Sequence, residues 1–219
     1  MPIRLSRNSR LVRFPSTDGL RLEGRLTPAD PDRSVVLCHP HPLYGGSMLT
    51  PVIMTAEQVF QAAGYTTLAF NFRGGGGSEG VHGEGRAEVA DVAGALDHLE
   101  AALGRVPSLQ VVAGYSFGSA VGGRVAATDR RVTGYLAIAP PVNRYDFAFL
   151  GAVSGRVALI AGSRDELCDR DRLEALRAAL PAPVWVRMLD TDHFFQGALE
   201  DLAAACREAV AWLQGTDPG

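Results

Sequence analysis

The sequence contains no lysine, because all 21 of its basic residues are arginines. This absence excludes chemistry that depends on a lysine amine, such as a Schiff base or the phosphate-binding lysine of a P-loop. Cysteine is also scarce: Cys38, Cys168 and Cys206 are an odd number and lie far apart. They fit neither a disulfide framework nor a paired zinc-ligand motif, so we expect reduced, buried thiols in a cytoplasmic protein.

Long apolar runs and an excess of positive charge are missing as well. No run of roughly 18 apolar residues occurs, which argues against a transmembrane helix. The net charge is -3, whereas a nucleic-acid-binding domain usually carries a basic face. Hydrophobic residues make up 47% of the 219 positions, enough for a sizeable core. We therefore expect a small-molecule substrate, with neither membrane nor nucleic acid as a partner.

Short apolar runs alternate with helical patterns along the chain, without repeats or linkers. Two strand-like runs flank the turn at 16–19 and predict an N-terminal antiparallel hairpin. Six further strands are expected in "SVVLCHP", "YTTLAFNF", "LQVVAGY", "VTGYLAIAP", "RVALIAG" and "PVWVRML". Helices are expected at 51–63, 86–103, 117–127, 169–180 and 197–214. The pattern predicts one α/β domain over 1–219, with a mostly parallel, doubly wound sheet of about eight strands.

One serine stands between two glycines directly after an expected strand. The segment "GYSFG" at 114–118 has the pattern Gly-x-Ser-x-Gly around Ser116. A sharp strand-to-helix turn would expose this hydroxyl, and it would require small residues at Gly114 and Gly118. The helix that follows would also direct backbone N–H groups at the site. The alternative is a glycine-rich turn in which the serine only caps the helix.

A reactive serine needs a base, and His193 follows the last expected strand. His82 and His98 lack this placement, since one lies in a glycine-rich loop and the other inside a helix. The base needs a carboxylate partner, and Asp165 lies just beyond a buried strand, in a loop that could reach His193. Four other acids compete for this role: Asp190, Asp192, Glu166 and Asp169. We favour Asp165, which gives the order serine, acid, histidine along the chain.

Backbone donors for an oxyanion are expected at two places. One is the N–H of Phe117, and the other belongs to the loop "HPHPLYGGS", whose prolines have no N–H. His41, Leu43, Tyr44 and the glycines remain available there. His39 and His41 could also ligate a metal, but no third ligand is evident nearby, so no metal is expected.

Three segments resemble the α/β-hydrolase family, and the similarity covers nearly the whole chain. "GYSFG" is similar to the nucleophile elbow, "LCHPHPLYGGSM" to the oxyanion-hole loop of small bacterial serine hydrolases without a lid, and "FNFRGGGGSEG" to the loop after the fourth strand. The resemblance implies an α/β-hydrolase fold with Ser116 as nucleophile, His193 as base and Asp165 as its partner. It further implies Phe117 and His41 as oxyanion donors, and no cofactor. Dienelactone hydrolases are a nearby comparison, but they typically carry cysteine at the position of Ser116.

The glycine-rich segment 75–80 also matches the dinucleotide pattern Gly-x-Gly-x-x-Gly. A dinucleotide site would need an acid at a strand end about 20 residues further on. Asp97 and Glu100 lie in that region, but inside an expected helix. We therefore expect a mobile loop beside the active site in place of a nucleotide site.

Together these features predict a serine hydrolase that cleaves a carboxylic ester through an acyl-enzyme. Thioester or peptide cleavage by the same residues, and a non-catalytic binding scaffold, are the alternatives. The segment 140–155 is too short for a large cap domain, so an open cleft is expected, which a homodimer contact could cover. Tyr44 and Tyr115 are candidate substrate contacts. Tyr145, Phe147 and Phe149 could line an acyl pocket or pack on the core, and Phe147 is the preferred contact among them.

Overall fold

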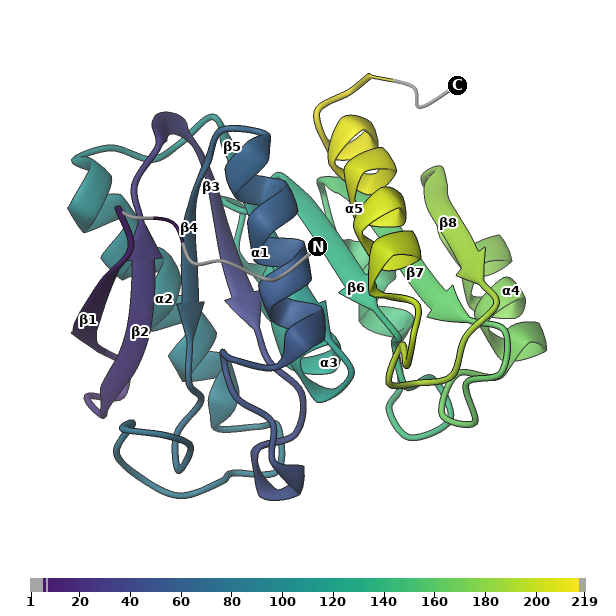
Figure 1. The fold of residues 1–219 in the computed structure, drawn as a ribbon, viewed down its shortest axis with the longest axis horizontal. Helices are drawn as coiled ribbons and strands as arrows, with labels where there is room; N and C mark the ends of the chain where they lie inside the picture. The colour runs from purple at the N-terminus through teal and green to yellow at the C-terminus, as the bar shows by residue number, and fades with distance from the viewer. Residues whose placement is uncertain (1–5, 7, 217–219) are drawn as a thin grey trace.

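Eight strands form a single sheet in the computed structural model, which describes residue 6 and residues 8–216 (Figure 1). In chain order the strands are β1 (Arg10–Pro15), β2 (Arg21–Thr27), β3 (Asp30–Cys38), β4 (Tyr65–Phe70), β5 (Leu109–Tyr115), β6 (Gly134–Ile138), β7 (Arg156–Gly162) and β8 (Val184–Leu189). Their spatial order is β1-β2-β4-β3-β5-β6-β7-β8. The β1–β2 and β2–β4 pairs are antiparallel and all others are parallel. This confirms the expected sheet and hairpin.

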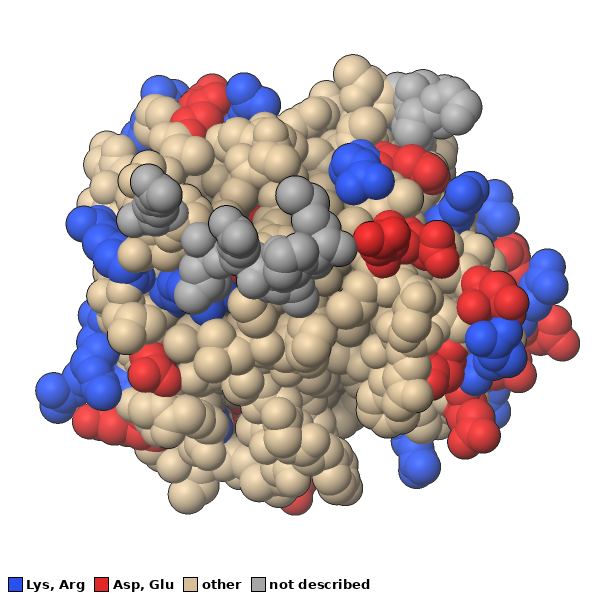
Figure 2. Space-filling view, viewed as in Figure 1, with Lys and Arg blue, Asp and Glu red and all other residues tan. Residues whose placement is uncertain are grey.

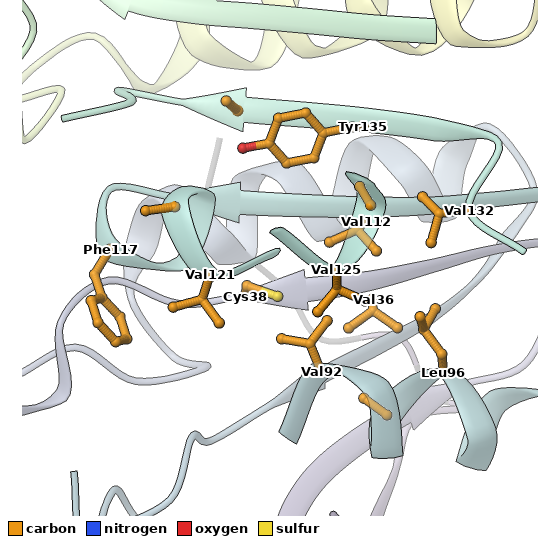
Figure 3. Packing of buried hydrophobic residues seen from close by; sticks show 14 of the residues in the cluster. Val36, Cys38, Val92, Leu96, Val112, Phe117, Val121, Val125, Val132 and Tyr135 are labelled. Carbon is orange, nitrogen blue, oxygen red and sulfur yellow. The ribbon is translucent and has the colours of Figure 1, made fainter. Parts of the chain in front are cut away.

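Helices cover both faces of the sheet. Helices α1 (Pro51–Ala62) and α5 (Leu199–Leu213) lie on one face, and α2 (Glu88–Leu103), α3 (Phe117–Thr128) and α4 (Arg170–Ala179) on the other (Figure 1). Successive strand residues point to opposite faces, so Val35 and Leu37 join the α1/α5 core while Val36 and Cys38 join the α2/α3 core. Figure 3 shows the α2/α3 core. The continuous apolar runs of the sequence follow from this double coverage.

Glycines and caps set the helix ends close to the expected positions. Gly64, with φ +86°, follows α1, and Gly104, with φ +69°, follows α2. The Asp169 side chain accepts a hydrogen bond from the Arg172 N–H and caps α4. The structure starts α2 at Glu88 and α5 at Leu199, two residues later in each case than the sequence predicts.

Two connections at the carboxyl ends of the strands contain a short helix. A 3-10 helix, η1 (Pro42–Tyr44), lies in the β3–α1 connection, and a second, η2 (Ala148–Ala152), is the only helix between β6 and β7 in the described chain. The described part of the chain contains no large cap domain, as expected. Within residue 6 and residues 8–216, no helix is both long and apolar enough to span a membrane.

The surface and the thiols agree with the composition. On the face in Figure 2, arginines and acids are interspersed near both sides, and few charges lie between them. Cys38, Cys168 and Cys206 are free and buried, and burial raises the pKa of each thiol above its usual range. Buried neutral thiols of this kind are poor nucleophiles.

Candidate active site

Ser116 occupies a strained turn between β5 and α3. Its φ of +52° and ψ of -120° are unusual for a residue with a side chain. Its backbone N–H donates to the Ile138 carbonyl at 2.9 Å, which holds the turn against β6. The Ser116 hydroxyl makes no capping bond to α3, so the interpretation as a simple capping serine does not fit.

The flanking glycines are required by close backbone contacts. A Cβ atom on Gly114 would lie 2.3 Å from the Gly118 carbonyl oxygen. One on Gly118 would lie 2.2 Å from the Cys38 carbonyl oxygen and 2.5 Å from that of His39. The turn thus packs directly against the end of β3, and it brings the loop after β3 beside Ser116.

Three side chains from separate strand ends form an unbroken chain of hydrogen bonds. His193 Nε2 lies 2.9 Å from Ser116 Oγ, and His193 Nδ1 lies 2.8 Å from Asp165 Oδ2. The second carboxylate oxygen of Asp165 accepts from the Leu167 N–H at 2.8 Å. All three are largely buried, with 9% of Ser116, 6% of Asp165 and 7% of His193 exposed. Burial strengthens these polar contacts because little water competes for them.

The competing acids are engaged elsewhere. Asp190 pairs with Arg164 on the surface, and Asp192 accepts from the N–H groups of Phe194 and Gln196. Asp169 caps α4 and Glu166 is exposed. In the described structure, Asp165 is the acid hydrogen-bonded to the His193 ring.

The loop after β3 leaves the N–H of His41 without an acceptor among the described residues. The N–H of Leu43 donates to His41 Nδ1, those of Tyr44 and Gly46 to the His41 carbonyl, and that of Gly45 to the Pro42 carbonyl. Among residue 6 and residues 8–216, no acceptor is found for the N–H of His41 or for that of Phe117. The rings of His41 and Phe117 lie 4.9 Å apart, so the two residues are neighbours. Of the loop alternatives, this favours His41 as the oxyanion donor.

His39 has a structural role. Its Nδ1 lies 2.6 Å from the Pro40 carbonyl, and its Nε2 accepts from the Phe72 N–H at 3.0 Å. Burial lowers the pKa of His39 to about 4, which keeps the ring neutral. Both ring nitrogens are therefore used by the backbone. Across the described residues, no group of three or more His, Cys, Asp or Glu could hold a metal ion.

Two of the three expected substrate contacts are buried instead. Tyr115 is 3% exposed and its hydroxyl donates to the His193 carbonyl at 2.9 Å. Phe147 is also 3% exposed and packs against Phe149 in the core. This burial argues for packing roles and corrects the prediction for both residues. Tyr44, at 87% exposed, lies beside His41 and remains available.

The glycine-rich segment 74–80 makes hydrogen bonds to neighbouring elements, which argue against the expected mobile loop. Glu23 of β2 accepts from the Gly77 N–H at 2.8 Å and from Asn71 Nδ2 at 2.7 Å. Ser78 Oγ donates to the Asn71 carbonyl, and Asn71 Oδ1 accepts from the Met48 N–H. This network joins the loop to β2 and to the loop after β3. Sequence reasoning missed Glu23 and Asn71, although an acid between apolar strand residues was a signal.

Comparisons with known proteins agree with this geometry. The model of the alpha/beta hydrolase family matches residues 35–218. The chain is similar to the uncharacterized protein RP471 of Rickettsia prowazekii (strain Madrid E), with 33% identity; the match covers 93% of this chain and 89% of that protein.

Two solved structures are similar over almost their full lengths. ATU1826 from Agrobacterium tumefaciens, a protein of unknown function and candidate alpha/beta hydrolase, is 32% identical with a TM-score of 0.86, covering 94% of this chain and 97% of that one. XC6422 from Xanthomonas campestris, an α/β serine hydrolase without a lid, is 31% identical with a TM-score of 0.82, covering 95% and 97%. Since the family model spans most of the sheet and these relatives share both sequence and fold, the chain belongs to the alpha/beta hydrolase family.

Proposed function

We propose that the protein is a serine hydrolase that cleaves a carboxylic ester through an acyl-enzyme on Ser116. The observation that carries this proposal is the hydrogen-bonded chain from Asp165 through His193 to Ser116. A serine hydroxyl is a weak nucleophile at neutral pH, and a base within hydrogen-bond distance activates it. Membership of the alpha/beta hydrolase family supports the same reaction class.

Acylation would proceed in two proton transfers. Ser116 Oγ attacks the ester carbon while its proton passes to His193 Nε2, and Asp165 stabilises the resulting imidazolium through Nδ1–H. The N–H groups of Phe117 and His41 would donate to the oxyanion of the tetrahedral intermediate. When the carbon–oxygen bond to the leaving group breaks, His193 returns its proton to the departing alcohol.

Deacylation repeats these steps with water. His193 takes a proton from the water as its oxygen attacks the acyl carbon of the Ser116 ester, and it then returns the proton to Ser116 Oγ. The acid product leaves and the free enzyme is restored. No cofactor enters either half-reaction.

The described chain places no large cap domain over the carboxyl ends of the strands, which favours substrates that need no enclosing cap. XC6422, described as a serine hydrolase without a lid, supports an accessible cleft. Thioesters would react by the same steps, with a thiol in place of the alcohol. A non-catalytic scaffold is disfavoured, because it would have no need of an intact hydrogen-bond chain behind Ser116.

Hydrolysis of p-nitrophenyl acetate, butyrate and octanoate tests the proposal. Ser116→Ala should lower kcat by about 10⁴-fold or more, because no nucleophile replaces the hydroxyl. Ser163→Ala is the matched control, since this exposed serine lies at the same edge of the sheet but outside the hydrogen-bond chain. Persistent turnover in Ser116→Ala at the wild-type rate would refute the mechanism.

A further inference from the structure

Three aromatic rings, two from loops and one from the start of α3, meet beside Ser116. The His41 ring lies 4.4 Å from the His82 ring and 4.9 Å from the Phe117 ring, and the His82 and Phe117 rings are 5.4 Å apart. The N–H groups of His41 and Phe117 both lack an acceptor among the described residues. The third ring, His82, therefore contacts the side chains of both candidate oxyanion donors.

His82 lies beside a buried carboxylate. Its Nδ1 lies 2.9 Å from Glu88 Oε1, and the Glu88 side chain is fully buried at the start of α2. The same carboxylate accepts from the Gly83 N–H at 2.7 Å and from the Gly85 N–H at 2.8 Å. Glu88 therefore fixes the backbone that follows His82 and also lies beside the ring.

A second anchor ties this segment to α3. Arg124 Nη1 donates to the Gly85 carbonyl at 2.9 Å. Gly85 has φ +79°, and a Cβ there would lie 3.2 Å from Phe117 Cε2. The segment from His82 to Gly85 therefore packs on Phe117, between helices α2 and α3.

His41, by contrast, belongs to a lightly held element. No residue of η1 is buried, and the Tyr44 ring that contacts His41 from η1 is 87% exposed. Nδ1 of His41 accepts a long hydrogen bond of 3.3 Å from the Leu43 N–H in the same loop. Partial burial is the main cause that lowers the pKa of His41, and the nearby His82 adds to it. The lowered pKa favours the neutral ring, in which Nδ1 can accept this bond.

We propose that His82 is a positioning residue for the oxyanion hole: carried by the segment whose backbone Glu88 fixes, its ring packs His41 against Phe117 and so fixes the two N–H donors relative to each other. This inference rests on the proposed function. Oxyanion donors act only within a narrow distance range, and loss of one costs about 10²–10³-fold in kcat. Loosening one donor without removing it should cost about tenfold, because the N–H still visits the productive position.

Three variants separate this role from general packing. His82→Ala removes the ring, and His82→Phe keeps a ring of similar shape without the nitrogens. His98→Ala is the matched control. His98 lies on α2, away from these loops, and its ring stacks on Phe14 at 5.0 Å. Arg124→Met loosens the same segment without altering any of the three rings, and it serves as a second variant should His82→Ala fail to fold.

Each variant is measured in three ways. Kinetics with p-nitrophenyl butyrate give kcat and KM separately. Inhibition by an alkyl trifluoromethyl ketone reports the oxyanion hole directly: Ser116 Oγ adds to the ketone carbon, its proton passes to His193, and the carbonyl oxygen becomes the bound oxyanion. Amide hydrogen exchange of segment 39–48 in the free protein reports the order of the loop that carries His41, whether or not the protein is active.

The expected result is a selective defect in His82→Ala. Its kcat should fall and its ketone inhibition constant should rise, each by about tenfold, while KM changes by less than about twofold. Exchange in 39–48 should accelerate. Arg124→Met should change in the same direction by a smaller factor, His82→Phe should restore most of the activity, and His98→Ala should match the wild type.

Two failures are distinguishable. If the wild type hydrolyses esters but His82→Ala keeps wild-type kcat, ketone inhibition and exchange, the role of His82 is refuted and the proposed function stands. If the wild type neither hydrolyses esters nor binds the ketone, the proposed function fails and the catalytic part of this inference fails with it. The exchange data then decide separately whether His82 orders the loop, and unchanged exchange would overturn that part as well.

Discussion

Replacing Tyr115 with Phe should impair proton transfer by His193, although His193 itself is not substituted. The Tyr115 hydroxyl donates to the His193 carbonyl at 2.9 Å from a position that is 3% exposed. Phe keeps the ring that packs against Phe195. Only the bond that ties the end of β5 to the histidine loop is lost, and the loop contains strain that this bond helps to hold, since Phe195 has φ +53°.

The magnitude follows from one buried hydrogen bond. A neutral bond of this kind contributes about 0.5–1.5 kcal/mol, and the carbonyl left without its partner raises the cost, so we expect a loss of roughly 1–2 kcal/mol in the free energy of unfolding. Burial is the main cause that raises the pKa of Tyr115 well above its ordinary value, and the charges of Asp165 and Asp192 add to it. Because the pKa is raised on folding, the contribution is fully present below about pH 10, where the unfolded tyrosine begins to ionise.

The functional effect should exceed the effect on stability. A histidine displaced by a fraction of an ångström transfers a proton less efficiently, and we expect kcat/KM to fall by about tenfold. Urea unfolding at pH 7 and pH 9 and ester kinetics measure both quantities. Tyr135→Phe is the matched control, because the buried Tyr135 hydroxyl donates to the Ser119 carbonyl at 2.6 Å, away from the histidine loop.

The control should lose similar stability but keep kcat/KM within about threefold. Equal kinetic losses in Tyr115→Phe and Tyr135→Phe would refute the reasoning, since the defect would then follow from lower stability alone. An unchanged Tyr115→Phe would also refute it.

Three further predictions concern the acid, the turn and pH. Asp165→Asn should lower kcat by about 10³–10⁴-fold with little change in KM, because the amide no longer stabilises the imidazolium; steady-state kinetics that show wild-type kcat would exclude Asp165 as the partner. Gly118→Ala should destabilise the fold by about 3 kcal/mol or more, since its Cβ would lie 2.2 Å from the Cys38 carbonyl oxygen. Gly151→Ala, whose nearest neighbour is at 4.0 Å, should cost less than about 0.5 kcal/mol in the same urea titrations, and equal losses would contradict the packing argument. The pKa of His39 is lowered to about 4, so its stabilising effect is present above pH 6.5 and is lost as the pH falls toward 4. The wild type should therefore lose roughly 3 kcal/mol more than His39→Asn across that interval, and parallel urea-stability curves would contradict this.

Local pattern was sufficient for the sheet and for the elbow around Ser116. Apolar runs bounded by turn residues predict each strand, because both faces of a parallel sheet are covered. Gly114 and Gly118 predict the turn because a tight strand-to-helix junction requires small residues on both sides of the serine. The order of Ser116, Asp165 and His193 along the chain indicates the family. Each residue follows a strand, and the strand ends meet at one edge of the sheet, so the three side chains can come together.

Side-chain surroundings were harder to predict because they depend on which distant segments pack together. Tyr115 shares its strand face with Val111 and Ala113, and all three lie in the α1/α5 core. Alternation along β5 could therefore have predicted its burial. Phe147 lies in an irregular segment without any period, so no pattern distinguishes a pocket wall from core.

Buried charges were beyond prediction from the sequence. Arg25 of β2 pairs with Glu57 of α1, and both side chains are almost fully buried. Charged residues are rarely buried unless paired, and nothing local in the sequence identifies the partner. The network of Glu23 and Asn71, and the contact between His41 and His82, likewise join segments that only the completed fold brings together.

Reaction with a fluorophosphonate probe tests the activated serine most directly, because it needs no knowledge of the natural substrate. Intact mass and peptide mapping of the wild type and His193→Ala give the stoichiometry and the labelled residue. The account predicts one label for each chain, on Ser116, and loss of labelling in His193→Ala. Absence of labelling in the folded wild type, or labelling that persists without His193, would contradict it.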